Sequence, residues 1–252
     1  MLDSRWASID AFAENNRDNI LRDITRLVAV PSVEGTPEPG APFGKGPKAA
    51  LDKALEIAAE LGLDTHNAEG YIGWAQTGPI ADGQKYLATI THTDVVPEGN
   101  GWDADPYTVR VRDGWLLGRG VADDKGPMIT ILYALKFLKE QGYSLKYPIR
   151  ALVGDNEETS MADVKYYLKH YPAPVFCFTP DAEFPVVVAH QSDAQVLRIP
   201  LTGHLRHLRS ALLPAPGASL RSHRPRSLAA RHFHTDIAAA GSLPPGAAEQ
   251  TR

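Results

Sequence analysis

The chain has 252 residues, of which 43% are hydrophobic and 22% are charged, and its formal net charge is -4. This composition is typical of a soluble globular protein that can bury a core, and the charge gives no reason to expect a nucleic acid or a membrane surface as partner. The single cysteine, Cys177, excludes an intramolecular disulfide. No apolar run approaches the ~20 residues that would span a bilayer, and the polar N-terminus is unlike a secretory signal. We therefore expect a cytoplasmic protein.

From the N-terminus to residue 117 the pattern predicts two helices, then strands. Apolar residues recur at helical spacing before Pro31 and again before Gly62, with a loop rich in Gly and Pro between them. Short apolar runs and turn residues such as Asp113-Gly114 predict strands and a hairpin. In order, the expected elements are a helix over residues 8–29, a loop over 32–47, a helix over 48–61, strands over 71–76 and 86–91, and a hairpin strand over 107–112 that returns as WLLGR.

Beyond the hairpin, helices alternate with short apolar strands. A largely apolar helix has Pro127 in its first turn, where the missing N–H costs nothing, and ends at Gly142. The rest of this rhythm is a strand over residues 149–153, a helix over 161–170 and a strand over 175–179. Alternation of this kind predicts an α/β fold, here a three-layer α/β/α domain.

The first candidate motif is His-Thr-Asp, directly after the strand over residues 86–91. Residues two apart on a strand face the same way, so His92 and Asp94 lie on one side. A metal-bound imidazole normally donates its other N–H to a carboxylate. His92 could therefore bind a metal while Asp94 orients its ring. A structural histidine beside an unrelated turn aspartate is the alternative.

Three acidic motifs follow. In GRGVADDKG, Asp123 could bridge two cations, or the two aspartates could be a helix N-cap and a solvated acid. In GDNEETS, one of Glu157 and Glu158 could bind a metal while the other acts as general base, or both could be acids at a helix N-terminus. Asp181 in PDAEFP could supply an oxygen ligand or occupy a turn. All these motifs lie where open α/β sheets gather ligands, so together they favour a metal site.

In this order, HTDVVP, GRGVADDKGP, the Glu-Glu pair and PDAEFP resemble the M20 family of dinuclear zinc metallopeptidases. The PFGKGP and DDKGPM segments make the chain most similar to the PepV/Sapep-like dipeptidases of that family, over roughly residues 10–190. The resemblance implies two divalent metal ions, zinc ahead of manganese or cobalt, and hydrolysis of the peptide bond of a dipeptide by metal-activated water. An M20 enzyme acting on N-acyl amino acids or on carboxypeptidase substrates is the alternative with the same chemistry.

The resemblance also implies a role for each site residue. His92 and Asp181 bind one metal, Glu158 binds the other, and Asp123 bridges both. The implied general base is Glu157, and Asp94 is the acid that orients His92. The peptide bond that follows Asp123 is expected to be cis.

Residues from Gly203 to Arg252 differ from the rest, with seven Arg, five His, two acidic residues and no Lys. The resemblance implies a further histidine for the second metal and a lid domain, and neither is recognisable after about Pro200. We therefore expect a partial catalytic domain over residues 1–200 and an irregular, disordered tail over residues 201–252, as from a shifted reading frame. A native disordered extension and a basic nucleic-acid arm are the alternatives. Such a chain is expected to hydrolyse peptides poorly, and an inactive metal-binding fragment is the competing function.

Overall fold

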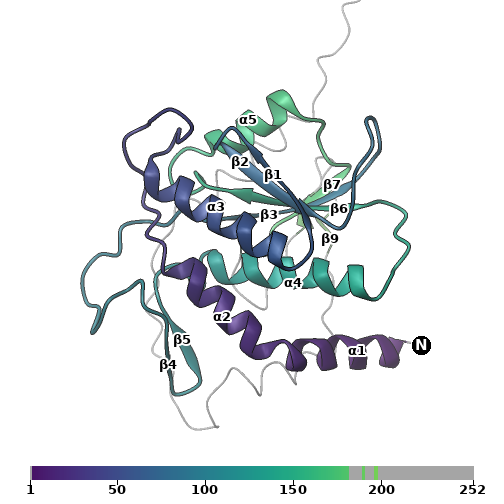
Figure 1. Cartoon of the computed structure of the whole chain (residues 1–252), viewed down its shortest axis with the longest axis horizontal. Helices are drawn as coiled ribbons and strands as arrows, with labels where there is room; N and C mark the ends of the chain where they lie inside the picture. The colour runs from purple at the N-terminus through teal and green to yellow at the C-terminus, as the bar shows by residue number, and fades with distance from the viewer. Residues whose placement is uncertain (1, 182–188, 191–195, 198–252) are drawn as a thin grey trace, which may run out of the picture.

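The computed structural model describes residues 2–181, 189–190 and 196–197, which form both helices and strands (Figure 1). The helices in these residues are α1 (Leu2–Asn15), α2 (Arg17–Val28), α3 (Lys45–Glu60), α4 (Lys125–Glu140) and α5 (Ala162–His170). The strands are β1 (Asp64–Ala68), β2 (Ile72–Gln76), β3 (Leu87–His92), β4 (Arg110–Arg112), β5 (Trp115–Leu117), β6 (Ile149–Gly154), β7 (Phe176–Phe178), β8 (Ala189–His190) and β9 (Val196–Leu197). The predicted α/β class is confirmed.

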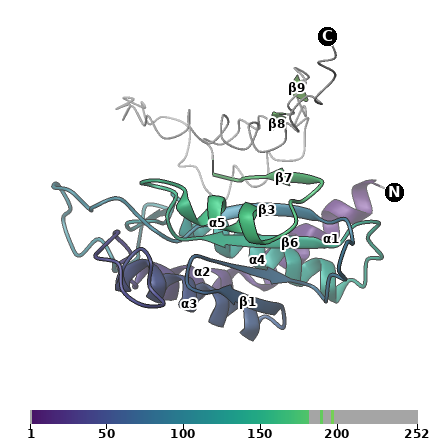
Figure 2. The same ribbon diagram turned by 90° about the horizontal axis from the view of Figure 1, so that it is seen from above.

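Five strands form one mixed sheet in the order β1-β2-β6-β3-β7, and Figure 2 looks onto it with β1 towards one edge and β7 towards the other. β3 pairs in parallel with both β6 and β7, whereas β2 pairs antiparallel with β1 and β6. The pairs β4–β5 and β8–β9 lie outside this sheet. Because β3, β6 and β7 are parallel, their carboxyl ends lie at the same end of the sheet, and the loops that follow them are neighbours.

The larger core lies between the sheet and helices α2, α3 and α4. Ala151 and Val153 are two residues apart on β6, so both side chains face these helices. They pack with Leu27, Leu51 and Met128, one from each helix, and all five are buried. This burial of apolar surface is the main contribution that holds the three helices on one face of the sheet.

The opposite face of the sheet packs against α5. Trp74, Ile90 and Leu152 are neighbours across β2, β6 and β3, and Tyr167 of α5 lies in the same buried cluster. Figure 1 shows α5 on one side of the sheet and α2, α3 and α4 on the other. The described residues therefore form the three layers that the sequence predicts.

The predicted helix over residues 8–29 is two helices, α1 and α2, separated by Asn16. The side-chain amide of Asn16 donates to the main-chain oxygen of Phe12 at 2.9 Å. Local bonds of this kind compete with helix continuation, which explains why the chain bends at Asn16. α1 still contacts the domain, because the rings of Phe12 and Phe137 meet edge-on with centroids 5.1 Å apart.

One predicted helix start was a little late, since α3 begins at Lys45 rather than Lys48. α4 begins at Lys125 and has Pro127 in its first turn, as predicted. Both helices open with Lys-Gly-Pro. The proline lies in the first turn, where a main-chain N–H needs no acceptor within the helix, so it does not delay the start.

The four predicted sheet strands are confirmed as β2, β3, β6 and β7, with ends shifted by one residue. β4 is shorter than the predicted strand over residues 107–112, since Thr108 belongs to a turn with Asp105. The sequence did not predict β1, whose residues are mostly polar and exposed. β1 forms because it pairs with β2 and because the ring of His66 stacks on Trp74 with centroids 4.1 Å apart.

The surface includes one apolar edge. Val175, Phe176 and Phe178, in and beside β7, expose 49%, 45% and 47% of their surface.

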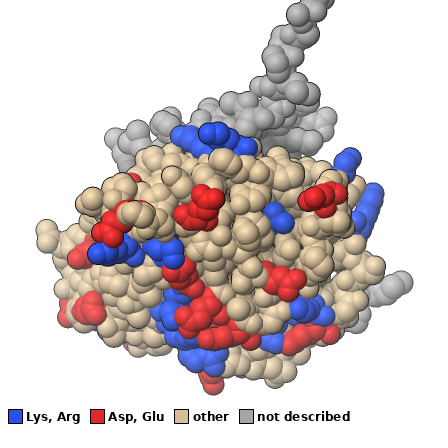
Figure 3. Space-filling model, turned by 45° about the horizontal axis from the view of Figure 1, so that its top comes forward, with Lys and Arg blue, Asp and Glu red and all other residues tan. Residues whose placement is uncertain are grey.

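On the face drawn in Figure 3, acidic and basic side chains are interspersed. Among the helices of the described residues, none is long and apolar enough to cross a membrane. The predicted tail over residues 201–252 lies outside the described residues.

Candidate metal centre

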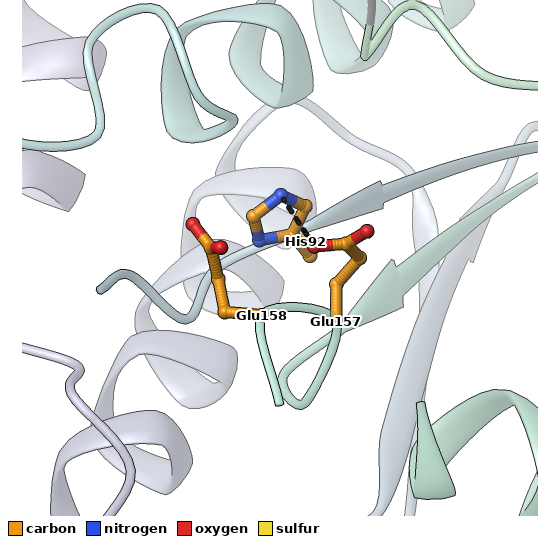
Figure 4. A group of neighbouring side chains, drawn as sticks. All are labelled: His92, Glu157 and Glu158. Atoms are coloured by element: carbon orange, nitrogen blue, oxygen red, sulfur yellow. Dashed lines mark ion pairs between the residues drawn. The ribbon is translucent and has the colours of Figure 1, made fainter. Parts of the chain in front are cut away.

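The parallel pairing of β3 and β6 brings the first site residues together. β3 ends at His92, and in the register of the two strands its partner is Gly154, the last residue of β6. The chain leaves β6 through a turn that carries Glu157 and Glu158. Figure 4 shows the His92 ring between the two glutamate side chains that rise from this turn. Asp181 follows β7 at the same end of the sheet.

His92 is 2% exposed, and carboxylates approach both of its ring nitrogens. Nδ1 lies 3.2 Å from Oδ1 of Asp94 and 3.0 Å from its main-chain oxygen. Nε2 lies 3.0 Å from Oδ1 of Asp123, 3.6 Å from Asp181 and 3.8 Å from Glu157. The ring is thus fixed on the Nδ1 side, and Nε2 faces a group of acids.

Asp94 makes a second contact, which its sequence motif does not predict. Its two carboxylate oxygens accept the main-chain N–H groups of Glu157 and Glu158 at 3.1 and 3.0 Å. Asp94 is 1% exposed, so these bonds form out of water. One buried carboxylate therefore links the His92 ring to the backbone of the glutamate pair.

The predicted ligands gather in two overlapping groups in the described residues. His92, Asp123 and Asp181 offer ligand atoms within 4.8 Å of one another, and so do His92, Glu157 and Glu158. His92 belongs to both groups, so each of the four carboxylates in them has an oxygen within 4.8 Å of a ring nitrogen of His92. The second group includes Glu157 beside Glu158, whereas the family resemblance implies that Glu157 is the general base rather than a ligand.

The protonation of these side chains is strongly perturbed. Burial raises the pKa of Glu157 to about 7 and that of Glu158 to about 7, and neighbouring carboxylates add to the effect. Burial alone would lower the pKa of His92, but hydrogen bonds with Asp123, Asp181 and Asp94 raise it well above its usual range. Cations would relieve this crowding of negative charge. A histidine nitrogen with several carboxylate oxygens is a donor set that zinc accepts, so the residues fit a divalent metal centre.

Two buried residues next to Asp123 also belong to the site. Asp124 is 0% exposed, and its Oδ2 accepts the main-chain N–H of His92 at 3.2 Å. Lys125 donates from Nζ to the main-chain oxygen of Val30 at 2.6 Å, which ties the start of α4 to the end of α2. The expected cis peptide bond between Asp123 and Asp124 is present. Asp124 occupies the N-cap position of α4, but its side chain is buried and makes no capping bond, so it is neither a side-chain cap nor a solvated acid.

Comparison with known proteins places the chain among peptidases. The model of peptidase family M20/M25/M40 matches residues 88–213, half of the chain. Beta-Ala-Xaa dipeptidase of Lactobacillus delbrueckii subsp. lactis is 42% identical over 182 residues, 71% of this chain and 38% of the relative. Putative dipeptidase YtjP of Bacillus subtilis (strain 168) is 36% identical over 185 residues, 72% of this chain and 39% of the relative. The chain thus spans about two fifths of the length of these relatives.

Solved structures agree on the fold. Human carnosine dipeptidase 1 superposes with a TM-score of 0.57 at 20% identity, covering 72% of this chain and 41% of that one. Aminopeptidase PepT from Bacillus cereus superposes with a TM-score of 0.50 at 17% identity, covering 66% of this chain and 44% of that one. The family match includes every predicted ligand, from His92 to Asp181. On the family match and these relatives together, the chain belongs to peptidase family M20/M25/M40.

Proposed function

We propose that this chain carries the cation-binding part of a dipeptidase, which hydrolyses the peptide bond of a dipeptide with two divalent metal ions. The observation that carries the proposal is the convergence of His92 with four carboxylates within two groups of ligand atoms 4.8 Å or less apart. The relatives that are 36–42% identical are a dipeptidase and a putative dipeptidase, which supports the substrate class. Zinc is the proposed metal, because it accepts both nitrogen and oxygen ligands.

In this proposal His92 and Asp181 hold one cation, Glu158 holds the other, and Asp123 bridges the two. The proximity of Asp123 and Asp181 to Nε2 of His92, at 3.0 and 3.6 Å, supports the first assignment. Bound divalent cations would polarise the peptide carbonyl and lower the pKa of a water molecule. Asp94 keeps the His92 ring and the glutamate turn in place.

Glu157 is the proposed general base. A base works best when its pKa lies near the working pH, and burial raises the pKa of Glu157 to about 7. Its carboxylate can take a proton from water and return it to the leaving amine. Glu157 lies 3.8 Å from Nε2 of His92 and is therefore beside the proposed ligands. A role as metal ligand is the alternative, and mutation of Glu157 must distinguish it from the role of base.

We propose that the 252-residue chain by itself turns over slowly. In the described residues, the second cation would have only Glu158 and the shared Asp123 as protein ligands, or Glu157 in addition. An incomplete set of ligands lowers affinity for the cation, and precise positioning of the substrate supplies much of an enzyme's rate. A cation-binding chain without activity is therefore the competing function.

The test is to purify the chain, load it with zinc or manganese, measure bound metal, and assay β-alanyl and α-dipeptides beside N-acetyl amino acids. We expect metal-dependent hydrolysis of dipeptides at well below the ~1–10³ per second that is usual for enzymes. Bound metal with no hydrolysis of any substrate would favour the inactive protein. Faster cleavage of N-acetyl amino acids would indicate N-acyl amino acids, rather than dipeptides, as the substrate class. Absence of bound metal would contradict the proposal.

A further inference from the structure

Two buried carboxylates hold the turn that presents the glutamate pair. Asp94 accepts the N–H groups of residues 157 and 158 at 3.1 and 3.0 Å. From the other direction, Oδ2 of Asp163 accepts the N–H groups of residues 155 and 156 at 2.9 and 3.2 Å. Four consecutive main-chain donors are therefore bound by two side chains. Each carboxylate is 1% exposed, so water does not offer the turn an alternative partner.

Asp163 reaches this turn from the first turn of α5, which packs on the sheet. Its other oxygen, Oδ1, accepts the N–H of Val164 at 2.7 Å, within the helix. If Asp163 only capped α5, its bonds would stay in that helix. Two of its three bonds instead go to the backbone before Glu157.

Gly154 makes room for the Asp163 carboxylate. A Cβ atom added at Gly154 would lie 2.5 Å from Oδ2 of Asp163, closer than such atoms approach in proteins. The same Cβ would lie 3.6 Å from Cβ of His92. The end of β6 is thus shaped so that the carboxylate sits between the metal-centre turn and the strand.

We propose that Asp163 is a positioning residue of the metal centre. From α5 it fixes the backbone of residues 155–156, and together with Asp94 it presents Glu157 and Glu158 in the geometry that receives a cation. The inference rests on the proposed function, since it assumes that Glu158 binds metal. Groups that orient metal ligands without touching the metal commonly change its affinity by 10–100-fold.

The experiment uses the full 252-residue chain and two variants, Asp163→Asn and Gly154→Ala. Asparagine has one oxygen, so its NH₂ group must face N–H donors either in the turn or in α5. Gly154→Ala keeps the Asp163 carboxylate itself but forces it to move, because the added Cβ would lie 2.5 Å from its Oδ2. The matched control is Asp23→Asn, which alters another aspartate that is 1% exposed and bonded to Tyr133 and two arginines of α2.

Each protein is titrated with Co²⁺ and followed by its visible absorption, and its unfolding midpoint in urea is recorded. We expect both test variants to bind Co²⁺ about 10–100-fold more weakly than the wild type, with an altered spectrum. Asp23→Asn should lower the unfolding midpoint and leave affinity and spectrum unchanged. If Asp163→Asn does not fold, Gly154→Ala decides the question.

The outcomes separate this inference from the function on which it rests. Wild-type affinity and spectrum in the folded test variants would overturn the role of Asp163 and leave the metal centre standing. An equal loss of affinity in Asp23→Asn would also overturn it, because the loss would then follow stability alone. A wild-type chain that binds no Co²⁺, Zn²⁺ or Mn²⁺ would overturn the metal centre itself, and the positioning role with it.

Discussion

His92 is constrained from two sides, and this is what gives each neighbouring acid a distinct place. Its Nδ1 faces Asp94, and its main-chain N–H is bound by Asp124. Only Nε2 remains directed at the acids that could share a cation with it. Within this frame Glu157 and Glu158 are neighbours in sequence but lie on different sides of the ring (Figure 4). Their proposed roles therefore make different predictions.

Glu158→Gln should weaken cation binding, whereas Glu157→Gln should bind as the wild type and lose turnover. The physical reason is that a ligand contributes to affinity, while a general base contributes ~10²–10⁴ in rate and little to affinity. Calorimetric titration with Zn²⁺ and a sensitive dipeptide assay would measure the two effects. If Glu157→Gln lost metal as readily as Glu158→Gln, the ligand role for Glu157 would replace that of base.

Asp23, far from the site in sequence, gives a prediction for pH. Burial would raise its pKa, but hydrogen bonds from Arg22, Tyr133 and Arg26 lower it below the usual range. The folded protein thus holds this proton less tightly than the unfolded chain. The stabilisation is fully present above pH ~4 and is lost as the pH falls through the lowered pKa.

We therefore expect Asp23→Asn to cost about 1–3 kcal/mol of unfolding free energy at pH 7. The difference from the wild type should shrink at pH 3, when measured by urea denaturation at both values. A difference that is equal at pH 3 and pH 7 would show that the charge of Asp23 does not contribute.

At the scale of elements, the start of α4 determines where Asp123 stands. The main-chain N–H of Lys125 donates to the oxygen of Gly120 at 2.9 Å, so the loop folds back on the helix start. A Cβ at Gly126 would lie 2.1 Å from the main-chain oxygen of Val121. A side chain at residue 126 therefore does not fit between this loop and the first turn of α4.

Gly126→Ala should for this reason destabilise the protein by about 1–3 kcal/mol, more than the ~1 kcal/mol that alanine gains over glycine in a helix. It should also weaken cation binding, since the shift displaces Asp123. Gly78→Ala is the matched control, because a Cβ there meets nothing within 4 Å. Equal stability of the two variants in thermal unfolding would contradict this account.

The elements show what the sequence could and could not predict. The sheet strands β2, β3 and β6 were predictable because their apolar residues pack into the two buried clusters, and β7 because it is a short apolar run between turn residues, although Phe176 and Phe178 are half exposed. β1 was not, because its stability comes from pairing with β2 and from the ring contact of His66 rather than from its own pattern. Asp163 was missed for a related reason: an acid in the first turn of a helix is ordinary, and only the fold shows that it reaches the turn after β6.

At the scale of the whole molecule, the metal centre concentrates charge where three strands end. Asp155 lies beside it: its carboxyl group is buried without a hydrogen-bond partner in the described residues, and burial raises its pKa to about 10, so the group is held neutral near pH 7 at a cost in stability. Without cations, the crowding and burial of these carboxyl groups destabilise the folded state. The metal ions would then contribute to stability as well as to chemistry.

We expect saturating Zn²⁺ to raise the unfolding midpoint of the chain and EDTA to reverse the effect. A cation at 1,000 times its dissociation constant adds ~4.1 kcal/mol if it binds only the folded state. Differential scanning fluorimetry across a Zn²⁺ series would measure the shift. The double variant Asp123→Ala, Glu158→Ala should show almost none of it, and a full shift in that variant would place the cation elsewhere.

The apolar edge formed by β7 has a consequence for how the protein behaves in the test tube. Two half-exposed phenylalanines lie on β7, the last strand of the described sheet, with the half-exposed Val175 beside them, and strand edges are templates for pairing with other molecules. Light scattering should therefore rise steeply with protein concentration, well before any loss of helical signal. Replacing Phe176 with lysine should raise the concentration at which turbidity appears, because charge on an edge strand opposes stacking of one molecule on the next.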